Sequence, residues 1–142
     1  MERARIDISR DLDGEPVVLA CADLREEELS AAAHAIGAMI RERFQGAEMS
    51  SDDVLELREL TSLGDEFGES VGGARTLVMS PARLSALRHA LTMYVESRDE
   101  AEWLRDEDRE PLAICRSLLW PLEDLGAEAI RAALSPDAAR PC

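Results

Sequence analysis

The chain has 142 residues, and its 46% apolar composition is typical of one globular domain that buries about two-thirds of its unfolded surface. Thirty acidic residues against sixteen basic ones give a formal charge of −14, which opposes direct binding to nucleic acid or to an anionic membrane. All sixteen basic residues are arginine. The absence of lysine excludes a lysine Schiff base and a lysine-dependent phosphate loop.

The N-terminal residues MERARIDISRD are charged and lack an apolar signal core, so we expect a cytoplasmic protein. No apolar run approaches the roughly eighteen residues of a membrane helix. Cys21, Cys115 and Cys142 match no zinc or redox spacing, and we expect reduced thiols, the first two in the core. Neighbouring acids lack the alternating spacing of a calcium loop, so neither a metal nor a cofactor is expected.

The first fifty residues predict a hairpin followed by a helix. Residues 3–10 alternate between apolar and polar side chains, as in a half-buried strand, and Asp11–Glu15 resembles a turn. The apolar run Pro16–Ala22 predicts a strand that is covered on both faces or placed centrally. Asp23 and the following acids resemble a capping box, so we place a helix from Asp23 to Gly46.

A second helix is expected from Ser50 or Ser51, because a serine cap and two aspartates complement a helix N-terminus. A strand over Leu55–Leu60 is the alternative. The segment Gly68–Gly73 is expected to be a loop. It contains the hydrolase motif G-x-S-x-G around Ser70, but here a helix precedes it and a strand follows. No acid separates Ser70 from the one later histidine, so a catalytic triad is not expected.

The stretch Arg75–Arg98 predicts the centre of the fold. Thr76–Met79 has the β-branched and apolar composition of a buried strand, and Ser80 with Pro81 provides a helix start. The helix that follows is apolar around most of its circumference, which indicates neighbours on several sides. Arg88 lies on its apolar arc. Its stem could lie on the core with the guanidinium in solvent, or the group could enter an ion pair or grip an anion.

The segment Glu96–Glu110 contains eight acids, three arginines and Trp103. Asp99 could cap a short helix here. A last helix is expected from Pro111 to about Leu134, with Pro121 on its solvent side. Trp120 lies at the edge of its apolar arc and is expected to be packed, either within the fold or at a subunit interface.

These elements predict a two-layer α+β fold, in which four or five helices pack mainly on one face of a small, mostly antiparallel sheet of about three strands. One domain is expected over residues 1–136, followed by a flexible tail over 137–142.

The first functional hypothesis is a non-catalytic, acidic interaction module, such as an adaptor, inhibitor or immunity-type protein. It would bind a basic protein through Trp103 and the acids Asp99, Glu102, Asp106 and Asp108. The motive is the charge together with an isolated tryptophan among acids. Trp103 could staple the acidic segment onto the body, or it could anchor a binding surface, where exposed tryptophans concentrate binding energy.

The alternative is a small enzyme or anionic-ligand-binding domain that uses Arg88 and His89, because arginine holds anions and histidine moves protons near neutral pH. His34 and His89, the two histidines, are otherwise expected at the surface. Either function is compatible with a homodimer, because the last helix has a wide apolar arc and the first strand leaves an edge that a second copy can pair with.

Overall fold

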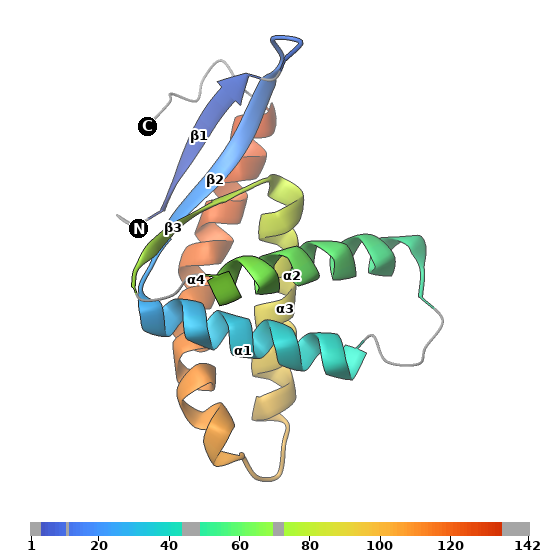
Figure 1. Cartoon of the computed structure of the whole chain (residues 1–142), viewed down its shortest axis with the longest axis vertical. Helices are drawn as coiled ribbons and strands as arrows, with labels where there is room; N and C mark the ends of the chain where they lie inside the picture. Colours follow the sequence, from blue (N-terminus) through green and yellow to red (C-terminus); the bar gives the residue numbers. More distant parts are fainter. Residues whose placement is uncertain (1–3, 11, 44–48, 70–72, 135–142) are drawn as a thin grey trace.

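The computed structural model describes residues 4–10, 12–43, 49–69 and 73–134, so the expected tail 137–142 lies outside the described residues (Figure 1). In these ranges the chain forms seven elements. They are β1 (Ala4–Arg10), β2 (Pro16–Leu24), α1 (Glu26–Arg43), α2 (Ser51–Glu69), β3 (Arg75–Met79), α3 (Pro81–Asp99) and α4 (Asp106–Leu134). The expected α+β class is confirmed. None of the described helices is both long and apolar enough to cross a membrane.

The three strands form an open antiparallel sheet in the order β1-β2-β3, so the apolar strand β2 is central, as its composition predicted. The register places Ile6 beside Ala20 and Ala20 beside Met79 across the sheet. Alternation puts these side chains on one face, where Ala20, Ala22 and Met79 are buried. The face that carries Arg5 and Val78 is more exposed, and Val78 is half exposed there.

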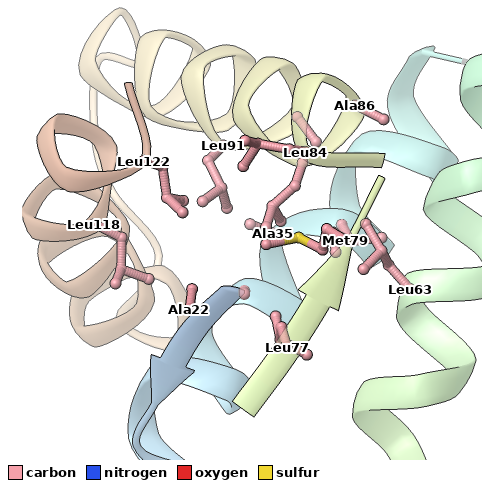
Figure 2. Packing of buried hydrophobic residues seen from close by; sticks show 14 of the residues in the cluster. Ala22, Ala35, Leu63, Leu77, Met79, Leu84, Ala86, Leu91, Leu118 and Leu122 are labelled. Carbon is pink, nitrogen blue, oxygen red and sulfur yellow. The ribbon is translucent and has the colours of Figure 1, made fainter. Parts of the chain in front are cut away.

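Helix α3 is the centre of the core, as expected, because it contacts α1, α2, α4 and the sheet. Its start is well defined: the Ser80 hydroxyl accepts a hydrogen bond from the Arg83 backbone nitrogen at 3.1 Å, and Pro81 occupies the first turn. Figure 2 shows how side chains from several elements converge on one interior, among them Leu84, Leu91, Met79, Leu77, Leu118 and Leu122.

Helix α1 begins later than the sequence suggested. Asp23 belongs to β2, where its carboxylate pairs with Arg5 and accepts a hydrogen bond from Thr76. The reciprocal capping contact comes instead from Glu28, whose Oε1 accepts from the Arg25 backbone nitrogen at 2.9 Å. The acid-rich run Glu26–Glu28 allowed several cap registers, and the length of β2 selected this one.

The expected short helix at Asp99 does not form: residues 100–103 are bends, residues 104–105 have no regular structure, and α4 begins at Asp106, five residues before Pro111. Acids in the first turn of α4 stabilise this earlier start. The α2 segment is a helix, so the strand alternative for Leu55–Leu60 was wrong.

The expectation that Trp120 packs into the fold was also wrong, since its side chain is 73% exposed. Helix α4 buries Leu118, Leu122 and Leu125, and Trp120 lies on the opposite side at 100° per residue. The apolar arc is wide enough to allow two orientations of the helix, and packing against α1 and α3 selected the one that exposes Trp120.

Candidate functional site

A polar cavity of about 390 Å³ lies between α1, the C-terminal end of α3 and the start of α4. Trp103 and Leu104 of the α3–α4 connection form one part of its lining, and His34 and Arg98 form another. The Trp103 side chain is 73% exposed, so the indole presents most of its surface to solvent at this cavity. An exposed aromatic ring beside a hollow is a favourable anchor point for a partner.

The inner part of the site is organised by Asp108, in the first turn of α4. Its carboxylate is almost fully buried and accepts hydrogen bonds at Oδ1 from the Tyr94 hydroxyl at 2.7 Å and from His34 Nε2 at 2.8 Å. Because an ionised carboxylate can only accept, the imidazole proton resides on Nε2. The His34 and Tyr94 rings meet edge to face, with centroids 5.9 Å apart. Three helices are thereby joined through one carboxylate.

Arg98 closes the network on the solvent side. Its guanidinium donates to both carboxylate oxygens of Glu42, at 2.8 and 2.9 Å, and lies 4.8 Å above the Tyr94 ring centre. Its Nε is 3.6 Å from Asp108 Oδ2. A planar guanidinium can satisfy two carboxylates and a ring face together, which an ammonium group cannot.

These contacts determine the protonation states. Burial alone would raise the pKa of the Asp108 carboxyl, but the hydrogen bonds from Tyr94 and His34 and the nearby Arg98 cation hold it below its ordinary value. The hydrogen bond from Arg98 lowers the pKa of Glu42. Burial and the contact with Asp108 raise the pKa of the Tyr94 hydroxyl. At neutral pH the site therefore holds two carboxylates, one guanidinium and a neutral phenol.

The predicted contact residues fall into two groups. Trp103, Glu102, Asp99 and Asp106 are exposed, whereas the Asp108 side chain is 7% exposed and belongs to the inner network. Asp99 pairs with Arg116, and Asp106 pairs with Arg109 at 3.2 Å. Within the described residues Glu102 forms no ion pair, so its charge is free to meet a partner.

Sequence reasoning missed His34, Tyr94, Arg98 and Glu42 as members of this site. His34 was expected at the surface, but α1 packs against α4 and brings its imidazole onto Asp108. One signal was available: Tyr94 and Arg98 are four residues apart and therefore share a helix face. The pairing of that face with Glu42 and Asp108 depends on helices distant in sequence.

Arg88 and His89 point to different neighbours. His89 is half exposed, and its Nδ1 lies 2.5 Å from Glu56 on α2, beside a second cavity of about 540 Å³. The Arg88 guanidinium lies against Gly126 of α4, and its buried Nε finds no hydrogen-bond partner in the described structure. The two side chains do not meet, as expected for consecutive residues on a helix.

The serine motif, the cysteines and the acidic groups provide no second candidate site within the described residues. Ser70 of the G-x-S-x-G motif lies outside the described residues. Cys21 and Cys115 are buried thiols, as expected, and burial raises the pKa of the Cys115 thiol to about 12, so a thiolate nucleophile is disfavoured there. Across residues 4–134, excluding the gaps in the description, no group of three or more potential ligands gathers into a metal site.

Comparison with known protein families, with curated proteins and with solved structures finds no match to this chain.

Proposed function

We propose that this protein is a non-catalytic, acidic interaction module that binds a basic segment of a protein partner at the surface around Trp103. The observation that carries the proposal is the position of the Trp103 indole, 73% exposed at the rim of the polar cavity. Tryptophan is enriched among the residues that carry most of the binding energy at protein interfaces.

The charges around Trp103 favour a cationic partner. Glu100 and Glu102 precede the indole in sequence, are exposed and form no ion pair within the described residues. A guanidinium or ammonium group that lies over the indole face gains a cation–π interaction, and the neighbouring carboxylates add charge-assisted hydrogen bonds. The overall charge of −14 increases the rate of encounter with such a partner.

The inner network supports a binding role for this surface. Asp108, Arg98 and Glu42 satisfy one another's charges, and the Tyr94 hydroxyl donates to Asp108. Such a network holds α1, α3 and the start of α4 in a fixed relation beneath the α3–α4 connection. A preorganised surface loses less entropy on binding than a mobile one.

The test begins with affinity purification of the protein from its native host, which identifies a partner by mass spectrometry. Calorimetry then compares the wild type with Trp103→Ala. Truncation of a tryptophan anchor costs at least about 2 kcal/mol, or roughly thirtyfold in Kd. Glu102→Gln is expected to give a smaller loss that diminishes as salt is raised.

Two control variants separate this surface from general effects. Leu55→Ala removes an exposed apolar side chain at the other cavity, and Asp65→Asn removes an exposed charge on α2. Both are expected to retain wild-type affinity. Unchanged affinity of Trp103→Ala for every recovered partner would refute the proposed surface.

A further inference from the structure

The outward face of α4 carries a line of apolar side chains that no described element covers. Trp120, Ala127 and Leu134 follow one another at seven-residue spacing, and Ile130 lies beside them. The exposed fractions of the three large residues are 73% for Trp120, 60% for Ile130 and 79% for Leu134. This line lies opposite the buried line of Leu118, Leu122 and Leu125, so α4 is apolar on two faces.

In a helix seam two positions of each seven-residue repeat face the partner. Here Trp120, Ala127 and Leu134 occupy the first position, and Glu123 and Ile130 occupy the second. Ala127 lies at the middle of the line, where its small side chain lets a second helix backbone approach closely. The large residues Trp120 and Leu134 lie seven positions to either side of it. A two-fold axis near Ala127 would therefore place Trp120 of each copy against Leu134 of the other, in a self-complementary contact.

The charges beside the line select the direction of this contact. Asp124 and Arg131 are exposed, lie on the same edge of the line and form no ion pair within the described residues. If two α4 helices run antiparallel about Ala127, Asp124 of each copy meets Arg131 of the other. A parallel two-fold arrangement turns the same edge of the two helices to opposite sides of the seam, so it does not form this pair.

We infer that the protein forms an antiparallel homodimer through the outward face of α4. The charge of −14 on each copy opposes association, but at physiological ionic strength charges farther apart than about 8 Å are largely screened. Opposite charges are in turn adjacent at the seam. A contact made by one helix from each copy is small, so we expect a dissociation constant on the order of micromolar.

The dimer would carry two copies of the Trp103 surface. Asp106, where α4 begins, is about 30 Å along the helix from Ala127 at 1.5 Å per residue. Antiparallel pairing about Ala127 would place the two Trp103 surfaces at opposite ends of the paired helices, about 60 Å apart. Such a module could hold two basic segments at once.

Sedimentation velocity of the full chain between about 1 and 100 μM, the range in which modest dimers form, tests the inference. The wild type is expected to convert from monomer to dimer as its concentration rises. Trp120→Glu should raise the dissociation constant at least tenfold. The matched control is Trp103→Glu, the same substitution at an equally exposed tryptophan outside the seam, and it should dimerise like the wild type.

A charge exchange tests the direction of the helices. Asp124→Arg and Arg131→Asp should each weaken the dimer, and the double variant should restore it, because the ion pairs re-form with their signs reversed. A wild type that stays monomeric at 100 μM, or equal losses in Trp120→Glu and Trp103→Glu, would overturn the inference. So would a double variant as weak as the single ones. The affinity of the Trp103 surface for its partner can be measured at concentrations at which the protein is monomeric. The proposed function can therefore hold or fail independently of the dimer.

Discussion

At the scale of single residues, Asp108 has a role that its surroundings in the sequence conceal. It lies in the run Asp106–Asp108, whose three acids look equivalent, yet the Asp106 side chain is 96% exposed and that of Asp108 is 7% exposed. Both lie in the first turn of α4, where a negative charge complements the helix dipole. The difference is that Asp108 also accepts hydrogen bonds from Tyr94 and His34 and pairs with Arg98.

Replacement of Asp108 by asparagine is expected to lower the free energy of unfolding by about 2 kcal/mol. The amide oxygen can still accept a hydrogen bond, but the charged interaction with Arg98 and part of the shared hydrogen bonding are lost. Urea denaturation measures the change. Asp106→Asn removes the same charge from the same turn and should alter stability by less than about 0.5 kcal/mol. Equal losses in the two variants would mean that dipole compensation, and not the inner network, is what Asp108 contributes.

At the scale of elements, the contact between α3 and α4 contains an unusual close approach. Arg88 of α3 lies over Gly126 of α4, and a Cβ at position 126 would be 2.3 Å from Arg88 Nη1 and 2.8 Å from its Cζ. The guanidinium thus occupies the space that a side chain would take. The glycine lets the two helices pack at this point, at a cost in helix propensity of about 1 kcal/mol relative to alanine.

A double-mutant cycle tests this contact. Gly126→Ala in an Arg88→Ala background should stabilise the protein by up to about 1 kcal/mol, because only helix propensity changes. In the wild-type background the displaced guanidinium should cancel or reverse that gain, since overpacking costs about 1–3 kcal/mol. Chemical denaturation of the four proteins gives the coupling energy, expected to exceed about 1 kcal/mol. A coupling near zero would show that Arg88 moves aside freely.

At the scale of the whole molecule, acidity and stability are linked through a few partly buried carboxylates. The pKa of Glu42, Glu56 and Asp108 is lowered in the folded protein. For Glu56, burial acts to raise the pKa, but the hydrogen bonds with Arg43 and His89 outweigh it. Each group binds protons more tightly in the unfolded chain, so each stabilises the fold at neutral pH and loses that contribution in acid.

The sign of this effect predicts how stability changes with pH. Above about pH 5 the unfolded carboxyl groups are ionised and the stabilisation is complete, and it is lost as the pH falls through the lowered folded values. Protonation of surface acids also relieves repulsion in a chain of charge −14, which acts in the opposite direction.

A comparison of the wild type with Asp108→Asn cancels the effect of the surface acids on stability, because both proteins share it. Their gap in unfolding free energy, measured by urea denaturation at several pH values, should be constant from pH 7 to 5 and narrow below about pH 4. The outcome that would contradict the prediction is a gap that widens in acid.

The sequence alone determined the kind of elements and their order. The alternation in β1, the apolar run of β2 and the Ser80-Pro81 start of α3 are local patterns, and they predicted an α+β fold centred on α3. The sequence left Trp103 open between packing the acidic segment onto the body and anchoring a binding surface, and the structure shows it exposed.

Tertiary structure decided which apolar face of α4 is buried and which acid of the run Asp106–Asp108 is internal. Both depend on the rotation of α4 about its axis, which is set by packing against α1 and α3 and not by any local pattern. That rotation brings Asp108 to His34, 74 residues away in sequence, and turns Trp120 outward. A helix with two apolar faces offers two nearly equivalent orientations, and only long-range contacts distinguish them.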